Sequence, residues 1–545
     1  MGFSRRYFFF GSLLAGAIPR GGFGSTISLK AAGYKSPNEK LNFAAIGSGG
    51  QGTSNIGAAA PTENIVALCD TDERRAAPIY ERYPNAPKFR DFRQMLDKEG
   101  KNIDAVIVAS PDHMHATHAI WSMERGKHVY VQKPLTRTVW EARQLREAAA
   151  KYKVATQMGN QGYSNEGTRQ CAEIVWSGEI GGVTEVHAWS DRPLWPQGLT
   201  DIPKEEPVPA TFDWDLWLGI ADKRPFTAGG KTEPDRWGGF FYQPFNWRGF
   251  YDFGCGALGD MACHILGAPN MALHLSKRRL LSVECIKKEG ASPFMFPKMS
   301  VIRYDFAAYG DMPALKIFWY DGLKETPKIE GVPEGEWLGD PPFNPAAFRA
   351  AGPPPGAGGP GGPGGGQGRG PGGGGGGRPA GGAMFGPGGM SRPGVGEFRS
   401  PGRVFNWAEF EALKAATEPL RFPSPDGSLF IGDKGMLTTG TYGEVTRLIP
   451  VDKMKDYRMP APLLTRSPGH MRDFIRACKG GDPACSNFDV ASPFVEWMLV
   501  GVAALRFEGK LEYDADKMRF TNNAEANKLL KPTFRKGWEF HTVKS

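Results

Sequence analysis

Asp260 and His264 are suited to acid–base chemistry on a hydroxyl group because of their types and their spacing. They follow a glycine-rich run, residues 254–259, that is typical of the entry into a helix. Side chains at i and i+4 share one helix face, so the Asp260 carboxylate can hold the His264 imidazole in one tautomer and stabilise its charged form. A surface ion pair without a catalytic role is the alternative for this pair taken alone.

Lys133 is the third residue with this chemistry. It follows an apolar run, residues 128–131, and precedes Pro134. At the end of a buried strand, a partly desolvated amine can orient or deprotonate a hydroxyl, although most lysines are solvated surface residues. We therefore predict that Lys133 and His264 handle the proton of a substrate hydroxyl as a hydride leaves the same carbon, while Asp260 orients His264.

A glycine-rich motif follows the first apolar run of the chain and reads Gly47-Ser48-Gly49-Gly50-Gln51-Gly52. Glycine permits a tight turn and lets the backbone approach a pyrophosphate at the N-terminus of the next helix. Asp70 ends the second apolar run, where a carboxylate accepts hydrogen bonds from adenosine ribose hydroxyls and repels a 2′-phosphate. The motif alone also fits a plain turn with a surface Asp. In this context it predicts a dinucleotide site that prefers NAD to NADP.

Further cofactor contacts are expected beyond the ends of the next two apolar runs, because ligands of open α/β sheets bind beyond the carboxyl ends of the strands. The residues predicted there are Ser110, Pro111, His115, Gln132 and Lys133. Three histidines, His113, His115 and His118, also suggest a metal site. No acidic or thiol ligand accompanies them at a suitable spacing, so we predict no metal and expect Asp112 to cap a helix.

Aromatic residues with polar neighbours form the predicted substrate site. Aromatic faces stack on the apolar C–H faces of sugar rings, and arginine and amide groups bond hydroxyls. The alternative is a tryptophan-rich packed core. The predicted substrate contacts are Asn160, Arg192, Trp195, Trp247 and Arg248.

Short apolar runs position these residues, and in the first part of the chain they alternate with helical patterns. The runs cover residues 41–46, 65–69, 103–109, 128–131 and 154–158. This alternation predicts a doubly wound parallel sheet over 38–160. Strand-like runs then follow one another without helices, which predicts an α+β domain with an open, mostly antiparallel sheet over 161–545. The predicted fold class is α/β.

Composition limits the function classes. The chain has 545 residues, 40% hydrophobic and 23% charged, which suits two globular domains. Of its formal net charge of +8, four charges fall in the first 32 residues. The rest of the chain has no basic block that could follow a phosphate backbone, so nucleic acid is not an expected partner. A tract almost entirely of glycine and proline within residues 350–400 predicts a disordered insert in the second domain.

The N-terminus predicts export. Arg5 and Arg6 precede an apolar stretch, residues 7–18, that is too short to span a bilayer comfortably. We interpret residues 1–34 as a twin-arginine signal and linker and expect a periplasmic protein, with membrane contact only through an uncleaved signal. This route carries proteins that have folded and loaded a cofactor in the cytoplasm.

Four motifs in order resemble those of the Gfo/Idh/MocA oxidoreductase family, which includes glucose–fructose oxidoreductase and inositol dehydrogenase. They lie at residues 45–52, 110–115, 126–135 and 256–264. The resemblance implies a Rossmann domain followed by an α/β domain with an open sheet. It also implies that Lys133 is the active-site lysine and that Asp260 and His264 match the family's acid–base pair. Gln132 departs from the glutamate usual before Lys-Pro in this family.

These features predict an enzyme that transfers a hydride between bound NAD and a secondary alcohol of a sugar, cyclitol or sugar derivative, and we also expect a homo-oligomer. Outside the cytoplasm no free NAD pool is expected. The alternative is therefore a redox-neutral glycoside hydrolase or lyase that recycles tightly bound NAD. A non-catalytic carbohydrate-binding protein is the third hypothesis.

Overall fold

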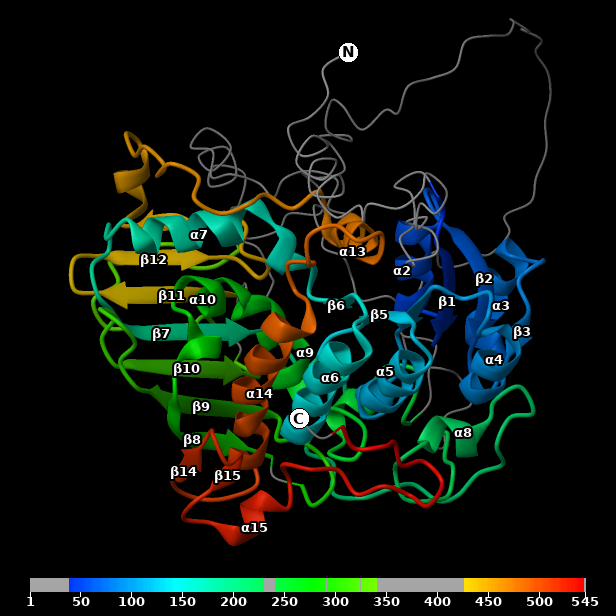
Figure 1. Ribbon diagram of the computed structural model, residues 1–545. Helices are drawn as coiled ribbons and strands as arrows, with labels where there is room; N and C mark the ends of the chain where they lie inside the picture. The colour runs from blue at the N-terminus through cyan, green and yellow to red at the C-terminus, as the bar shows by residue number, and fades with distance from the viewer. Residues whose placement is uncertain (1–38, 230–240, 291, 324, 341–425, 544–545) are drawn as a thin grey trace, which may run out of the picture. The chain divides into compact units, whose positions relative to one another are not determined.

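The computed structural model describes residues 39–229, 241–290, 292–323, 325–340 and 426–543 (Figure 1). The chain divides into two compact units, residues 1–39 and 40–545, and the elements below belong to the second unit. The predicted export signal and the Gly/Pro-rich insert lie outside the described residues. No helix among the described residues is both long and apolar enough to cross a membrane.

The first sheet has six parallel strands in the order β3-β2-β1-β4-β5-β6. They are β1 (Asn42–Ile46), β2 (Asn64–Cys69), β3 (Lys88–Phe89), β4 (Ala105–Val108), β5 (His128–Val131) and β6 (Thr156–Met158). The order reverses between β1 and β4, where an open α/β sheet leaves a crevice beyond the carboxyl ends of its strands. The predicted doubly wound parallel sheet is confirmed.

Helices connect these strands, and acidic residues cap the starts of two of them. They are α2 (Gln51–Ala59), α3 (Glu73–Arg82), α4 (Phe92–Glu99), α5 (His115–Glu124) and α6 (Val139–Tyr152), with the short 3₁₀ turn η1 (Asp112–Met114) before α5. Asp72 and Asp91 accept hydrogen bonds from backbone amides at the starts of α3 and α4.

The second sheet has nine strands in the order β13-β12-β11-β7-β10-β9-β8-β14-β15. They are β7 (Val183–Ser190), β8 (Leu280–Glu289), β9 (Met299–Phe306), β10 (Leu315–Asp321), β11 (Gly427–Gly432), β12 (Met436–Thr439), β13 (Arg447–Ile449), β14 (Leu511–Asp514) and β15 (Arg519–Phe520). The pair β7 and β10 is parallel and the other pairs are antiparallel. The predicted mostly antiparallel sheet is confirmed.

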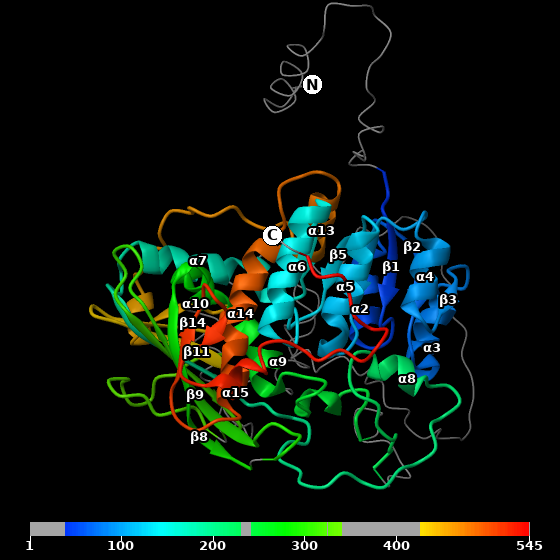
Figure 2. The same cartoon turned by 60° about the horizontal axis from the view of Figure 1, so that its bottom comes forward.

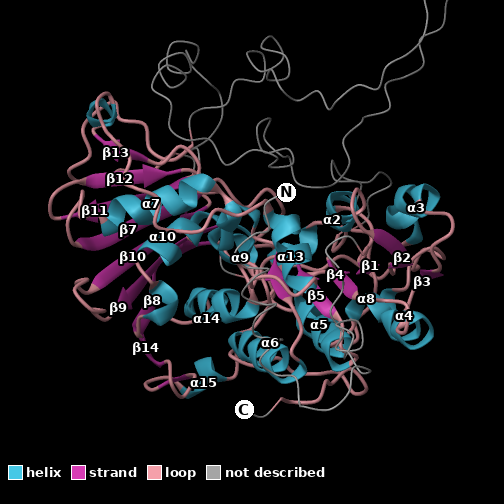
Figure 3. Ribbon diagram, turned by 45° about the horizontal axis from the view of Figure 1, so that its top comes forward, coloured by secondary structure: helices cyan, strands magenta, loops and turns pink. Residues whose placement is uncertain are grey.

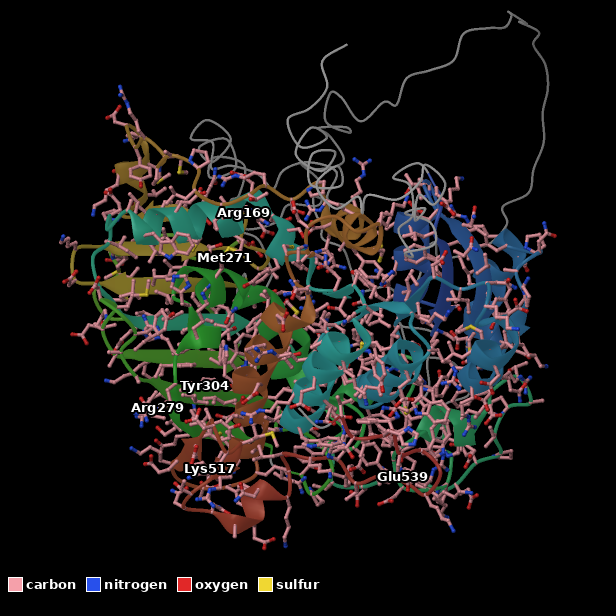
Figure 4. The ribbon with its side chains drawn as sticks, viewed as in Figure 1. Arg169, Met271, Arg279, Tyr304, Lys517 and Glu539 are labelled. Atoms are coloured by element: carbon pink, nitrogen blue, oxygen red, sulfur yellow. The ribbon has the colours of Figure 1, made fainter. Side chains whose placement is uncertain are left out.

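Helices separate the two sheets. They are α7 (Glu166–Trp176), α9 (Gly256–Ile265), α10 (Gly267–Ala272) and α14 (Phe488–Ala504). The buried helix α14 packs against α6 on one side and β8 on the other (Figure 2). The Tyr304 hydroxyl on β9 donates a 2.8 Å hydrogen bond to the Met498 carbonyl on α14, which ties this helix to the sheet (Figure 4).

Shorter elements complete the described chain. They are α8 (Trp214–Leu218), α15 (Ala524–Asn527), η2 (Gln161–Ser164), η3 (Asn246–Gly249), η4 (Leu275–Lys277) and η5 (Val451–Met454).

Two described segments meet where the chain departs at residue 340 and returns at residue 426. The Asp340 amide donates a 2.9 Å hydrogen bond to the Asp426 carbonyl. Gly339 and Gly427 lie so close that a Cβ on Gly427 would stand 2.3 Å from the Gly339 Cα. The two ends of the intervening segment are therefore joined at one point beside β11.

A helix from late in the chain completes the core of the first domain. The helix α13 (His470–Cys478) lies beside α2 (Figure 3), and its Phe474 ring packs edge-on against Phe43 at 6.1 Å and Tyr130 at 5.8 Å. At its end, Lys479 forms a 2.8 Å ion pair with the buried Glu63. The hydrophobic core of residues 41–130 thus includes a helix that the local sequence pattern does not assign to it.

Phe474→Ala is expected to lower the free energy of unfolding by about 3–5 kcal/mol, because it removes a fully buried ring from that core. Urea denaturation followed by tryptophan fluorescence measures the change. Arg472→Ala, on the exposed side of the same helix, is the matched control and should change stability by less than about 0.5 kcal/mol. Equal effects of the two substitutions would contradict this role for α13.

Candidate active site

A cleft of about 1530 Å³ lies at the carboxyl ends of β1, β2, β4 and β5, where the fold predicts a ligand. Its other wall comes from the second domain, including the loop at residues 243–248, the helix α9 and Tyr442. Most sequence-predicted site residues line it: Gly47, Gly49, Gln51, Asp70, Ser110, Pro111, His115, Gln132, Lys133, Arg192, Trp247, Arg248, Asp260 and His264. Ser48, Gly52, Asn160 and Trp195 do not.

The glycine turn has the close packing that a pyrophosphate cradle needs. Gly47 and Gly50 adopt positive φ values of 78° and 57°, which favour glycine. A Cβ on Gly52 would stand 1.9 Å from the Gly47 carbonyl oxygen, so only glycine lets α2 start this close to β1. Ser48 lies behind the turn, where its hydroxyl donates to the Cys69 carbonyl at 3.0 Å. Gly52 and Ser48 therefore shape the turn from outside the cleft.

Asp70 lies at the tip of β2 and faces the same turn. Its carboxylate accepts a 2.8 Å hydrogen bond from the Gly49 amide and a 3.0 Å bond from the Asp72 amide. Burial raises the pKa of Asp70 to about 6, although these amide bonds lower it. The residues at this end fit an adenosine ribose, because a carboxylate at the cleft wall is an acceptor for its hydroxyls.

His115 and Gln132 line the cleft near the ends of β4 and β5. The His115 Nδ1 lies 2.8 Å from the Pro134 carbonyl and its Nε2 lies 2.7 Å from the Ser110 carbonyl. Burial lowers the pKa of His115 to about 4. The buried Gln132 amide donates a 2.9 Å hydrogen bond to Asn55 on α2. The Gln132 bond connects the end of β5, next to Lys133, to the helix that follows the glycine turn.

Lys133 and Asp260 form the central ion pair of the cleft and join its two walls. The Lys133 Nζ donates to the Asp260 Oδ1 at 2.7 Å and to the Asp260 carbonyl at 2.9 Å. Arg248 Nε donates to the same Oδ1 at 3.0 Å, and Arg192 Nε lies 4.0 Å from Oδ2. Burial alone would raise the pKa of Asp260, but the three cations hold it well below its usual range.

The structure changes the predicted role of Asp260 toward His264. Both line the cleft, but among the described residues the Asp260 side chain bonds Lys133 and Arg248 rather than His264. The His264 ring packs against Tyr442 with centroids 4.7 Å apart, and its Nδ1 is buried without a hydrogen-bond partner. Burial holds the pKa of His264 well below its usual range. The ring is therefore positioned by packing, with one nitrogen left for a ligand.

Arg248 is fixed by aromatic rings on the second-domain wall. Its guanidinium carbon lies 4.2 Å from the Phe245 ring centroid and 4.3 Å from that of Trp247. The Trp247 ring belongs to a buried aromatic cluster that also holds Trp214 and Trp217. The packed-core alternative therefore describes part of the aromatic region, while Trp247 both packs there and lines the cleft.

Two predicted substrate contacts lie elsewhere. The buried Trp195 donates its indole N–H to Gln197 at 3.0 Å, and its ring packs edge-on against Phe245 behind the cleft wall. Asn160 is buried and accepts a 2.7 Å hydrogen bond from the Ser486 hydroxyl. A residue's place along the chain does not reveal which side of a loop it faces, and direct contact of these two residues with a substrate stays a prediction.

Several cleft residues were missed from sequence. Asp112 was expected to cap a helix, but no side-chain cap bond is present at η1 or α5, and its buried carboxyl lines the cleft instead. Burial raises its pKa to about 7. Gln243, Tyr442 and His470 also line the cleft from loops and a helix far from the motifs. The position of Asp112 beyond β4 was the one signal available.

No group of three or more His, Cys, Asp or Glu residues in the described ranges is placed to hold a metal ion. Each of the three motif histidines has at least one ring nitrogen that bonds within the protein, as described for His115 above. His113 Nε2 lies 3.1 Å from the Trp217 carbonyl, and His118 Nδ1 lies 2.9 Å from the Ser110 hydroxyl.

Comparison with known proteins identifies the first domain. Residues 41–160 match the model of GFO_IDH_MocA, an oxidoreductase family with an NAD-binding Rossmann fold. This segment resembles the NAD-binding Rossmann domain of that family. It is the part of the chain that carries the glycine turn, Asp70 and Lys133, which line the cleft described above.

Curated relatives match part of this chain. Inositol 2-dehydrogenase of Salmonella typhimurium is 30% identical over 125 residues, covering 23% of this chain and 37% of that protein. D-glucoside 3-dehydrogenase of Escherichia coli is 31% identical over 131 residues, covering 24% and 36%. Glycosyl hydrolase family 109 protein 1 of a Shewanella species is 31% identical over 140 residues, covering 24% and 30%. The chain thus spans well under half the length of these relatives.

One solved structure extends the likeness over both domains. The WlbA dehydrogenase of Bordetella pertussis, crystallised with NADH and UDP-GlcNAcA, has a TM-score of 0.51 and 13% identity. The match covers 88% of this chain and 100% of that one. At this identity the likeness concerns the fold, and it agrees with the arrangement of one parallel and one mostly antiparallel sheet.

The affinity for NAD is expected to fall as the pH is lowered through about 6. The ionised Asp70 carboxylate accepts hydrogen bonds, whereas the protonated form populated below its pKa of about 6 has less acceptor capacity. Calorimetric titration at about pH 8 and about pH 5 should show a roughly tenfold weaker Kd at the lower value. Asp70→Asn should bind weakly at both values, and the same pH dependence in this variant would assign the effect to another group.

Proposed function

We propose that the protein is an NAD-dependent oxidoreductase that transfers a hydride between bound cofactor and a secondary alcohol of a sugar, cyclitol or sugar derivative. The observation that carries this proposal is the Lys133–Asp260 ion pair, which faces the cleft beyond the end of β5. The matches to dehydrogenases of inositol and of glucosides support it. Because those matches cover part of each protein, the activity of the whole chain is a proposal.

The residues present fit the cofactor. The backbone at Gly49 and Gln51 would hold the pyrophosphate, because glycine leaves room there and the α2 N-terminus offers amide groups. Asp70 would bind the adenosine ribose, and Gln132 and Ser110 line the cleft on the opposite side. When bound, NAD supplies the hydride acceptor.

Lys133 would orient the substrate hydroxyl by donating a hydrogen bond, and His264 would accept its proton. Two of its N–H groups are taken by the carboxylate and carbonyl of Asp260, which leaves the remaining donor for a hydroxyl in the cleft. Asp260 compensates the charge of the lysine and fixes its position. The unpartnered Nδ1 of His264 lies in the same wall and is the second group available to a reacting hydroxyl.

A redox-neutral glycosidase is the second candidate. The glycosyl hydrolase family 109 relative favours it. In that case purified protein would already carry NAD, detected by mass spectrometry, and would cleave a glycoside without added cofactor. NADH production that rises steadily with added free NAD would support the dehydrogenase instead. The non-catalytic carbohydrate-binding hypothesis has less support, because it gives no reason for the buried ion cluster.

We also infer that the chain is exported through the twin-arginine route to the periplasm and forms homo-oligomers. Arg5 and Arg6 with the apolar stretch after them support export. Arg5→Lys combined with Arg6→Lys should leave the protein in the cytoplasmic fraction, and unchanged export would refute the signal. Light scattering of the purified chain tests self-association, and a monomeric mass would refute it.

Lys133→Met is expected to lower turnover by about 10²–10⁴-fold, because it removes the charged donor that orients the hydroxyl and stabilises the negative charge that develops on its oxygen. The Kd for NAD should change by less than about threefold, since the lysine contributes little to binding the cofactor as a whole. Steady-state rates on a sugar and glycoside panel and calorimetry measure the two effects. Lys98→Met, on the exposed face of α4, is the matched control. Full turnover by Lys133→Met would end the assignment.

A further inference from the structure

The second-domain wall of the cleft is rich in hydrogen-bond donors. Arg192 and Arg248 from this wall and Lys133 from the first domain converge on one carboxylate, that of Asp260. Lysine and arginine side chains donate hydrogen bonds and accept none. The carboxylate oxygens of Asp260 cannot satisfy every donor that surrounds them.

Three buried nitrogens in this wall have no hydrogen-bond partner in the described structure. They are Arg192 Nε, Gln243 Nε2 and His264 Nδ1, which come from the segment after β7, a loop and α9. Each of these residues lines the cleft, and Gln243 is 3% exposed. A buried donor without a partner is unfavourable, so the Arg192 and Gln243 nitrogens indicate that a ligand supplies the missing acceptors, whereas His264 Nδ1 donates or accepts according to its tautomer.

Net charge alone does not define this site. Asp191 pairs with Arg192 through Nη1, and Asp112 adds a second carboxyl to the cleft lining. The cations are therefore compensated, but the compensating groups leave Arg192 Nε unbonded. This wall therefore holds more hydrogen-bond donors than the neighbouring acceptors can satisfy.

A carboxylate fits this surplus better than a hydroxyl. An ionised carboxylate only accepts hydrogen bonds, whereas every hydroxyl that accepts one must also donate one. Arginine pairs well with planar carboxylates, and charge-assisted bonds of this kind are roughly twice as strong as neutral ones. The rings of Phe245 and Trp247 hold the Arg248 guanidinium in one orientation, so little side-chain entropy remains to be lost on binding.

We propose that the substrate is a sugar acid and that its carboxylate binds between Arg192 and Arg248, with Gln243 as a further contact. This inference rests on the proposed function, because it assigns the substrate class of the same cleft. The hydroxyl that reacts would then lie at Lys133, beside the carboxylate subsite. Arg192 and Arg248 act here as specificity-determining residues.

Calorimetry on NADH-loaded protein tests the proposal with matched ligands. D-glucuronate is compared with D-glucose and with the neutral methyl ester of glucuronate, and D-galacturonate with D-galactose. At least one acid should bind tenfold or more tightly than its neutral partners. Equal or tighter binding of the neutral sugars, or no binding by any acid, would overturn the proposal. Glucose 6-phosphate is the third arm, and its binding more tightly than glucuronate would overturn the assignment of a carboxylate.

Two variants localise the preference. Arg192→Gln should reduce the ratio between acid and neutral sugar to less than threefold, and Arg192→Lys, which keeps the charge without Nε, should reduce it in part. Arg519→Gln on the exposed edge strand β15 is the control and should leave the ratio unchanged. The Kd for NADH reports whether each variant keeps its fold. An unchanged ratio in folded Arg192→Gln would overturn the proposed subsite.

This inference and the proposed function fail in different ways. Hydride transfer from neutral sugars only, seen as NADH formation, would leave the oxidoreductase proposal intact and refute the sugar acid. Tight binding of an acid with no hydride transfer and no cleavage would support the carboxylate subsite and refute the oxidoreductase proposal.

Discussion

The contact between Lys133 and Asp260 joins two parts of the chain that have separate sheets. The lysine follows the end of a parallel strand in the first domain, and the carboxylate comes from the helix α9 of the second domain. A buried carboxylate is stable as an anion only when cations and hydrogen bonds replace its lost hydration. Here Lys133, Arg248 and Arg192 do so together, which fixes the two walls of the cleft relative to one another at the proposed reaction centre.

The same constraint explains the surrounding architecture. Arg248 reaches Asp260 because aromatic rings pack against its guanidinium group. Lys133 is held in place by its neighbour Gln132, which bonds to α2. The position of the Lys133 side chain therefore depends on α2, the helix that follows the glycine turn. Binding at the turn and the orientation of the hydroxyl at the lysine share one rigid framework, as a reaction that aligns cofactor and substrate requires.

Local patterns in the sequence were sufficient to predict the parallel sheet, its glycine turn and the strand ends that carry Asp70 and Lys133, because apolar runs and turn residues report local structure. They were insufficient where distant segments decide the outcome. The Asp260–His264 spacing placed both on one helix correctly, yet the carboxylate turned to cations from other elements. Likewise, Phe474 joins the first domain's core from a helix whose pattern reveals an apolar face but not its partner.

The hydrogen bond between Asp340 and Asp426 holds together the two points at which the chain leaves and rejoins the second sheet. Since both ends of the intervening segment are held at one point, a segment of another length could leave from and return to the same place without a change in the strands on either side. The junction is accordingly a natural place to graft a reporter or an affinity handle.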